Sequence, residues 1–224
     1  MTLTRAVLFD LDGTLIDSVP DITEAVAELM GSEGLAAHDE AAVRRMVGHG
    51  VEKLVERAFA AHGRALEPGG LVAMTARMMT IYPRHLVAKT RLMPGVEQAL
   101  DRLAGMALAV VTNKPEGPTR SILQHFALLD RFALVLGDRG PGRLIKKPAP
   151  DMLLYAATAL GSSAADTVMV GDSGADILAA RAARMRSVAV RGGYHAEPLE
   201  TYAPDLVIDT LEQLDLMGVG TSAA

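Results

Sequence analysis

The sequence predicts a doubly wound α/β fold, a Rossmann-like parallel sheet core, with a small all-helical cap domain inserted into it. Short continuous apolar runs recur along the 224-residue chain, at 6–9, 107–111, 168–170, 187–190 and 206–208. Such runs are typical of parallel strands buried on both faces. Helical patterns alternate with these runs, at 95–103, 117–125, 150–160 and 174–183. This alternation favours βαβ units and a doubly wound sheet.

The stretch from 18 to 89 departs from this alternation and contains no convincing strand. It is typical of several amphipathic helices, because apolar residues share one helical face, as at Ile22, Val26, Leu29 and Met30. We therefore predict an α/β core formed by residues 1–17 and 90–224. Residues 18–89 are predicted to form a helical cap over the carboxyl-terminal edge of the sheet.

Composition and charge exclude several classes of protein. The chain has 22 Lys and Arg against 27 Asp and Glu, a net charge of -5, so it lacks the basic excess of a nucleic-acid surface. It has no cysteine, which excludes disulfides, thiolate metal sites and cysteine nucleophiles. No apolar run approaches the roughly 18 residues that span a bilayer. We expect a cytoplasmic protein that binds neither nucleic acid nor membrane, and the choice between monomer and homodimer stays open.

Three of the expected strands end at a polar residue, namely Asp10, Thr112 and Asp172. In open α/β sheets, ligands bind beyond the carboxyl ends of the strands, near the point where strand order reverses. Each residue alone is also explained as an ordinary turn residue. Their neighbours make a common functional site the better interpretation.

Asp10 and Asp12 are separated by one residue directly after the first strand. Both carboxylates can enter one site if the chain turns sharply, which Gly13 permits. They would repel each other unless a cation lies between them or one is protonated. Mg²⁺ binds carboxylate and carbonyl oxygens of this kind. The competing interpretation is an acidic turn that caps the next helix, which does not require Asp10.

A second acidic pair, Asp172 and Asp176, lies at the start of an expected helix. Their spacing of four residues brings both carboxylates to one side of the first turn. Asp176 is also explained as a simple capping residue, since the helix dipole favours a carboxylate there. Together the two acidic pairs would complete a metal site.

Hydrogen-bond donors and positive charge follow two further elements. Thr112 and Asn113 offer a hydroxyl and a backbone N–H to an anionic oxygen. Pro148 keeps the chain extended before a helix and would direct the preceding Lys146 and Lys147. One such lysine can contact a carboxylate and a phosphate together. Two solvated loop lysines are the competing interpretation.

In this order, Asp-x-Asp-Gly-Thr-Leu, Thr-Asn, Lys-Pro and Gly-Asp-Ser-x-x-Asp resemble the motifs of the haloacid-dehalogenase (HAD) superfamily of phosphohydrolases. The helical insertion resembles the superfamily's first type of α-helical cap, and the resemblance covers about residues 5–215. It implies a phosphatase in which Asp10 attacks phosphorus to form an aspartyl-phosphate. Asp12 would protonate the leaving alcohol and then activate water.

The resemblance also implies how charge is neutralised. Mg²⁺ would be held by the Asp10 carboxylate, the Asp12 carbonyl and Asp172, with Asp176 supporting them from the layer behind. Thr112 and Lys147 would neutralise the phosphoryl oxygens. Lys147 is preferred to Lys146 because the superfamily's lysine directly precedes the proline. Dehalogenases lack an acid at the position of Asp12, so its presence favours phosphoryl transfer.

Among the phosphatases, the chain most resembles bacterial phosphoglycolate phosphatases. Further stretches carry this resemblance, at 47–51, 91–96, 110–115, 192–194 and 203–209. It implies a phosphoric monoester hydrolase acting on a small phosphorylated metabolite, with 2-phosphoglycolate as the first candidate. The alternatives are a β-phosphoglucomutase-like phosphomutase, a phosphatase for another sugar phosphate or pyrophosphate, or a non-catalytic phosphate sensor.

Substrate binding is expected from Asn113 and from a glycine-flanked loop of the cap. Arg45, Gly48 and His49 precede or lie in that loop, which would reach the site on closure and exclude water. A cation or donor there would bind a substrate carboxylate. The competing interpretation is that these are ordinary solvated side chains.

Overall fold

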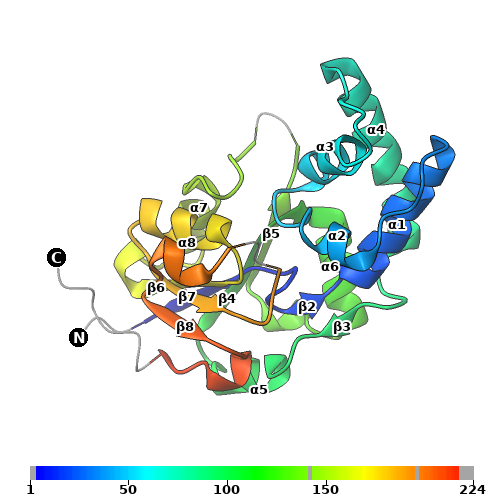
Figure 1. The fold of residues 1–224 in the computed structure, drawn as a ribbon. Coiled ribbons are helices and arrows are strands. Elements are labelled where there is room, and N and C mark those ends of the chain that lie inside the picture. The colour runs from blue at the N-terminus through cyan, green and yellow to red at the C-terminus, as the bar shows by residue number, and fades with distance from the viewer. Residues whose placement is uncertain (1–3, 141–142, 195–196, 217–224) are drawn as a thin grey trace.

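A six-stranded parallel sheet forms the core of the computed structural model, which describes residues 4–140, 143–194 and 197–216 (Figure 1). Its strands are β1 (Ala6–Phe9), β4 (Ala107–Pro115), β5 (Leu134–Asp138), β6 (Thr167–Gly171), β7 (Arg186–Val190) and β8 (Leu206–Ile208). Their order across the sheet is β5-β4-β1-β6-β7-β8. β4 and β5 lie on one side of β1, and the later strands β6, β7 and β8 lie on its other side. The strand order therefore reverses at β1, which puts the carboxyl ends of β4, β1 and β6 side by side.

Helices cover both faces of this sheet, namely α5 (Val96–Arg102), α6 (Glu116–His125), α7 (Asp151–Ala159) and α8 (Gly174–Ala182). Side chains alternate along β1. Val7 and Phe9 pack into an apolar cluster with residues of α5 and α6. Leu8 faces the opposite cluster, with residues of α7 and α8. Because both faces are buried, every residue of β1 is apolar, and this produces the continuous runs seen in the sequence.

The helical cap lies between β2 (Ile16–Asp17) and β3 (Arg91–Leu92), an antiparallel pair at which the chain leaves and re-enters the core. It contains α1 (Val19–Ser32), α2 (Glu40–Arg44), α3 (Val51–Ala60) and α4 (Pro68–Ile81). The inner faces of these helices form an apolar core of their own. The cap projects from one end of the sheet (Figure 1). The fold confirms the predicted α/β core with an inserted helical cap.

Short 3₁₀ helices complete the described elements, at Tyr82–Arg84, Leu129–Arg131, Ala164–Asp166, Leu199–Tyr202 and Leu211–Gln213. One expected strand end was wrong, because β4 continues past Thr112 to Pro115. Pro115 pairs with Asp138 of β5 after a shift in register, so the polar residues of this segment still belong to the sheet. None of the described helices combines the length and apolar character needed to cross a bilayer.

Candidate active site

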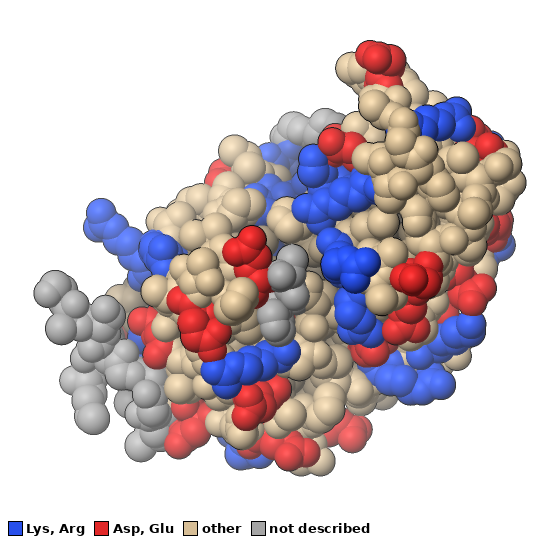
Figure 2. Space-filling model, viewed as in Figure 1, with Lys and Arg blue, Asp and Glu red and all other residues tan. Residues whose placement is uncertain are grey.

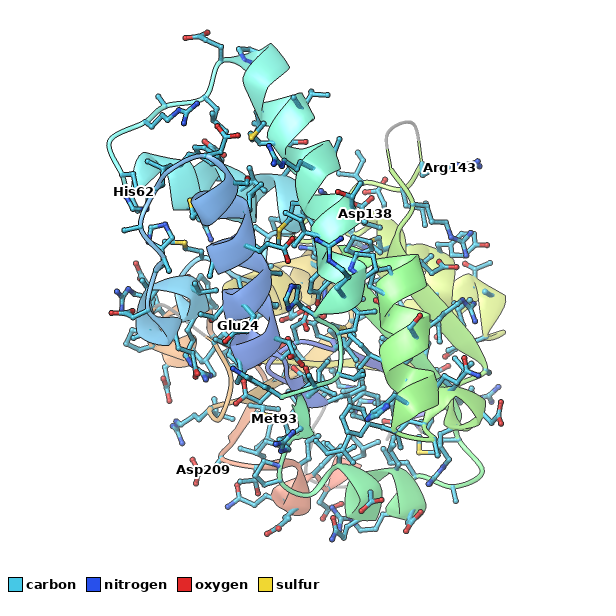
Figure 3. The ribbon with its side chains drawn as sticks, turned by 90° about the vertical axis from the view of Figure 1, so that its right-hand side faces the viewer. Glu24, His62, Met93, Asp138, Arg143 and Asp209 are labelled. Carbon is cyan, nitrogen blue, oxygen red and sulfur yellow. The ribbon has the colours of Figure 1, made fainter. Side chains whose placement is uncertain are left out.

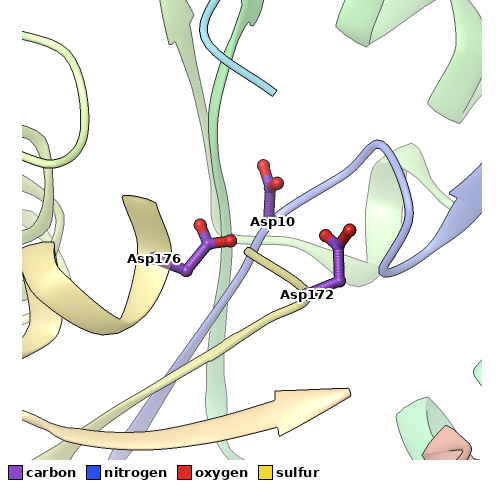
Figure 4. A group of neighbouring side chains, drawn as sticks. All are labelled: Asp10, Asp172 and Asp176. Atoms are coloured by element: carbon purple, nitrogen blue, oxygen red, sulfur yellow. The ribbon is translucent and has the colours of Figure 1, made fainter. Parts of the chain in front are cut away.

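Three buried carboxylates meet at the carboxyl ends of β1 and β6 (Figure 4). Asp10 follows β1, Asp172 follows β6, and Asp176 lies in the first turn of α8. One oxygen from each lies within 4.8 Å of the others. The backbone N–H of Asp10 donates to the carbonyl of Val170 at 2.9 Å, which ties the ends of the two strands together. The reversal of strand order at β1 therefore brings together acids that are far apart in sequence.

Glycine allows two backbone segments to approach the Asp172 carboxylate. Gly13 has a φ of +86°, and a Cβ there would lie 2.2 Å from Oδ2 of Asp172. A Cβ on Gly193 would lie equally close, at 2.2 Å from the same oxygen. The closely packed carboxylate accepts hydrogen bonds from the Thr14 hydroxyl at 2.9 Å and the Tyr194 N–H at 2.7 Å. The sharp turn expected at Gly13 therefore brings the backbone of this segment close to the Asp172 carboxylate.

Lys147 is the buried cation of this cluster. Its Nζ lies 2.9 Å from Oδ1 of Asp10 and 2.6 Å from Oδ1 of Asp176, and it donates to the carbonyl of Val111 at 2.7 Å. The side chain of Lys147 is 1% exposed. Such a fully enclosed ammonium is held in place by its three partners.

Lys146 points elsewhere. Its Nζ lies 3.1 Å from Oδ2 of Asp138, a residue at the end of β5 on the flank of the core (Figure 3). The side chain of Lys146 is one-third exposed. The two adjacent lysines therefore have different environments, and only Lys147 contacts Asp10.

Asp176 has both carboxylate oxygens occupied. Oδ1 accepts from Lys147, while Oδ2 accepts from the backbone N–H of Ser173 at 3.1 Å and from its hydroxyl at 2.6 Å. The capping interpretation of Asp176 therefore holds as well, since these contacts start α8. Asp176 therefore links the N-terminus of α8 to Lys147, and its carboxylate adds a third negative charge next to Asp10.

Burial and the neighbouring charges shift the pKa values of the members of this cluster. Burial raises the pKa of Asp10 to about 6; Lys147 opposes this rise, and the charge of Asp176 adds to it. Burial and the charges of Asp10 and Asp176 raise the pKa of Asp172 well above its ordinary value. Burial alone would lower the pKa of Lys147, but the carboxylates of Asp10 and Asp176 raise it.

A divalent cation fits this donor set. Oδ1 of Asp10 is buried and contacts the Lys147 ammonium, yet it accepts no well-aligned hydrogen bond from the described residues. The cluster offers carboxylate oxygens, which hard cations such as Mg²⁺ prefer. A cation would also offset the repulsion between carboxylates, which adds to the effect of burial on the two pKa values. The residues are thus suited to hold a divalent ion.

Asp12 lies next to this cluster with a cation of its own. The ammonium of Lys114 lies 2.8 Å from Oδ1 and 3.0 Å from Oδ2 of Asp12. The hydroxyl of Ser18 donates to Oδ1 at 2.5 Å. Lys114 was not among the residues predicted to form the site. The available signal was its place in Thr112-Asn113-Lys114, directly after the expected end of a strand.

Asn113 supports the lysine loop. Its Oδ1 accepts from the N–H of Lys147 at 3.0 Å, and its Nδ2 donates to the carbonyl of Lys147 at 3.0 Å. Nδ2 also donates to the carbonyl of Gly48 in the cap at 3.2 Å. The side chain that was expected to bind substrate therefore holds the Lys147 backbone and touches the cap.

A cavity between cap and core joins these groups. From the core it is lined by Asp10, Asp12, Thr112, Asn113, Lys114 and Pro115. From the cap it is lined by Ile22, Val47, Gly48, Gly50, Val51, Leu54, Met78 and Tyr82. Asp10 and Asp12 thus face a space whose cap side is mainly apolar, which is suited to exclude water from a reacting group.

The predicted cap residues divide between two cavities. Gly48 lines the cavity that contains Asp10, whereas Arg45 and His49 line a neighbouring one with Arg57 and Tyr194. Lys and Arg side chains gather along the junction of cap and core on the face seen in Figure 2. Burial and the charge of Arg57 lower the pKa of His49, so this imidazole is biased toward its neutral form. Neither Arg45 nor His49 lines the cavity of the carboxylates.

Tyr194 connects the carboxylate cluster to the start of the cap. While its N–H binds Asp172, its hydroxyl accepts from the N–H of Ser18 at 2.7 Å and donates to Oδ1 of Asp17 at 2.7 Å. The guanidinium of Arg44 in α2 lies 4.9 Å from the centre of its ring. This residue was not among the predicted site residues, although it lies in one of the stretches that carried the resemblance.

The comparisons with known proteins agree with this geometry. The chain is 39% identical over 218 residues to the phosphoglycolate phosphatase of Rhodospirillum rubrum, covering 95% of this chain and 90% of that protein. It is 38% identical to phosphoglycolate phosphatase 1 of Pseudomonas aeruginosa, covering 95% and 79% of the two proteins.

The fold also matches solved structures. The crystal structure of a predicted phosphoglycolate phosphatase from Haemophilus somnus superposes with a TM-score of 0.86, at 30% identity over 95% of this chain and 96% of that one. A family model described as haloacid dehalogenase-like hydrolase matches residues 4–184. This match confirms the family indicated by the four motifs. The chain belongs to the haloacid dehalogenase-like hydrolases.

Proposed function

We propose that this hydrolase is a phosphatase that cleaves a small phosphate monoester, 2-phosphoglycolate, through an aspartyl-phosphate. The observation that carries this proposal is the placement of Asp10, which faces the cavity with Lys147 on one side and Asp12 close by. The names of the relatives in Rhodospirillum rubrum and Pseudomonas aeruginosa support the substrate.

In the first step, a carboxylate oxygen of Asp10 attacks phosphorus, and the bond from phosphorus to the ester oxygen breaks. Asp12 gives its proton to the departing alkoxide. Lys147 and the Thr112 hydroxyl offset the charge of the phosphoryl oxygens. In the second step Asp12 takes a proton from water, which attacks phosphorus and frees Asp10 and inorganic phosphate.

Mg²⁺ is the cation that we propose for the cluster. Asp10, Asp172 and the Asp12 carbonyl would hold it, and its charge would let an anionic nucleophile face an anionic phosphate. Asp176 supports the site from behind, because its oxygens already bind Lys147 and Ser173. The oxygen-only donor set supports Mg²⁺ over softer metals.

The proposal also includes movement of the cap and a cellular compartment. Residues 18–89 act as a cap that moves relative to the core, since the substrate must enter the cavity between the two. The β2–β3 pair at its base is where such a movement would begin. The absence of cysteine supports a reducing, cytoplasmic environment.

Removal of divalent ions is expected to abolish phosphatase activity, and added Mg²⁺ to restore it. Mg²⁺ is also expected to raise the unfolding temperature more at pH 8 than at pH 5. Without metal, the pKa of Asp10 rises from 3.8 to about 6 on folding, so its contribution to stability is lost as pH increases through 6. Above that pH the carboxylate is ionised, and the cation no longer has to displace a proton.

This prediction is checked by thermal unfolding at the two pH values, in EDTA or in Mg²⁺, with Na⁺ at equal ionic strength as the control. Phosphate release is measured under the same conditions. Full activity in excess chelator would contradict the metal assignment. An equal shift in unfolding temperature at both pH values would contradict the role given to Asp10.

Among phosphate esters, 2-phosphoglycolate is expected to have the highest kcat/KM, by about tenfold or more over sugar phosphates, nucleotides and pyrophosphate. The measurement is release of inorganic phosphate across this panel with saturating Mg²⁺. A higher kcat/KM for a sugar phosphate or pyrophosphate would reassign the substrate. An isomerised sugar phosphate without net phosphate release would instead identify a phosphomutase.

A further inference from the structure

Two polar groups in the cavity have no part in the phosphoryl-transfer steps. The first is the ammonium of Lys114, whose side chain is 4% exposed. The second is the hydroxyl of Tyr82, which is buried beside the Lys114 ammonium and donates to no acceptor among the described residues. A buried hydroxyl without an acceptor costs stability, so its retention needs an explanation. Both groups line the cavity that contains Asp10 and Asp12.

Lys114 and Tyr82 are neighbours although they come from opposite sides of the cavity. Lys114 lies in β4 of the core, and Tyr82 directly follows α4 of the cap. The Lys114 ammonium lies 4.9 Å from the centre of the Tyr82 ring. The same ammonium contacts both carboxylate oxygens of Asp12, so Lys114 brings a positive charge to this part of the cavity.

The two buried lysines of the site face different parts of a phosphate ester. Lys147 contacts Asp10, the group that attacks phosphorus, whereas Lys114 contacts Asp12, the group that protonates the ester oxygen. The carbon chain beyond that oxygen therefore extends toward Lys114. In 2-phosphoglycolate a single methylene separates the ester oxygen from the carboxylate, which places the anion within reach of this lysine.

The other cap side chains that line the cavity are apolar, namely Ile22, Val47, Val51, Leu54 and Met78, and Gly48 and Gly50 lie among them without a side chain. These apolar side chains offer no partner to a sugar hydroxyl that lies against them, and unpaired polar groups are strongly disfavoured in such a site. A short anion, by contrast, finds one cation and one hydroxyl donor. The cavity therefore matches a small acid better than a polyol.

We propose that Lys114 and Tyr82 bind the carboxylate of the leaving group, the first by an ion pair and the second by a hydrogen bond from its hydroxyl. This inference rests on the proposed function, because it names the part of the enzyme that selects a carboxylate-bearing phosphate ester. It gives the proton of the Tyr82 hydroxyl an acceptor that arrives with the substrate.

The test compares 2-phosphoglycolate with ethyl phosphate, which has the same two-carbon skeleton without the carboxylate. Tyr82→Phe removes only the hydroxyl and leaves the Lys114–Asp12 contact in place. It is expected to lower kcat/KM for 2-phosphoglycolate by about tenfold while that for ethyl phosphate stays within about twofold. Lys114→Met is expected to reduce the preference for 2-phosphoglycolate by about 100-fold. Because it also affects Asp12, the ratio of the two substrates is its readout.

Matched controls are Tyr155→Phe, at an exposed tyrosine outside the cavity, and Lys53→Met, at an exposed lysine of α3. Both are expected to keep the wild-type ratio. If Lys114→Met does not fold, Tyr82→Phe decides the matter alone. A wild type that prefers 2-phosphoglycolate, with variants that keep the preference, would overturn the carboxylate site alone. A wild type without that preference would overturn the substrate assignment together with the carboxylate site.

Discussion

Replacing Asp10 by asparagine is expected to lower turnover of a phosphate monoester by about 10⁴-fold or more while the protein stays folded. An amide oxygen is a poor nucleophile, and no other carboxylate replaces it, because Asp172 and Asp176 are fixed by their own hydrogen bonds. The check is phosphate release together with the unfolding temperature. Without metal, that temperature is expected to equal or exceed that of the wild type, since a buried negative charge is removed.

Asp138→Asn is the matched control for this variant. Asp138 also ends a parallel strand and also pairs with a lysine, but it lies outside the cluster of three carboxylates. Turnover is expected to stay within about twofold of the wild type, as for most surface substitutions. A folded, active Asp10→Asn protein would refute the nucleophile assignment, whatever the control shows.

Replacing Lys147 by methionine is expected to lower turnover by about 10³-fold, because the phosphoryl oxygens lose a fixed positive charge. The same change leaves Asp10 and Asp176 without their buried partner, so the free energy of unfolding without metal is expected to fall by about 3 kcal/mol or more. Steady-state kinetics and denaturant unfolding measure the two effects.

Lys146→Met is the matched control for Lys147, since the two lysines are adjacent but only one is enclosed. Its partly exposed pairing with Asp138, outside the cluster of three carboxylates, predicts little change in either turnover or stability. The opposite pattern, with an active Lys147→Met protein and an inactive Lys146→Met protein, would mean that the wrong lysine has been assigned.

Much of the core was predictable because most of its strands contain a short apolar run that is followed by a polar residue. The limits of β1 and β8 match their apolar runs. β5 was not predicted, although it contains Leu134, Val135 and Leu136. It is an edge strand that ends in Gly-Asp, and its apolar run at 132–136 follows the helical pattern at 117–125 so closely that it also fits a helix or a loop.

The acids were predictable for a related reason, since topology carries residues at neighbouring strand ends to one place. Lys147 lies in a loop, and it was chosen over Lys146 from the resemblance, because it directly precedes a proline. Contacts across the cavity were not predictable in the same way. The approach of Tyr82 to Lys114 depends on how the cap lies over the core, which no local pattern specifies. Likewise, the orientation of Arg45 and His49 into a neighbouring cavity depends on how α2, α3 and their connecting loop pack.

Tyr194 has a consequence for how ions and substrate act on one another. Its main chain holds Asp172, while its phenol holds Asp17 and Ser18, where the chain leaves for the cap. When two ligands are coupled, each changes the binding free energy of the other by the same amount. An ion at Asp172 that favours one cap position raises the affinity for a substrate that binds in that position. The substrate then raises the affinity for the ion by the same factor. The effect of substrate on ion affinity and the effect of the ion on substrate affinity therefore measure the same coupling free energy.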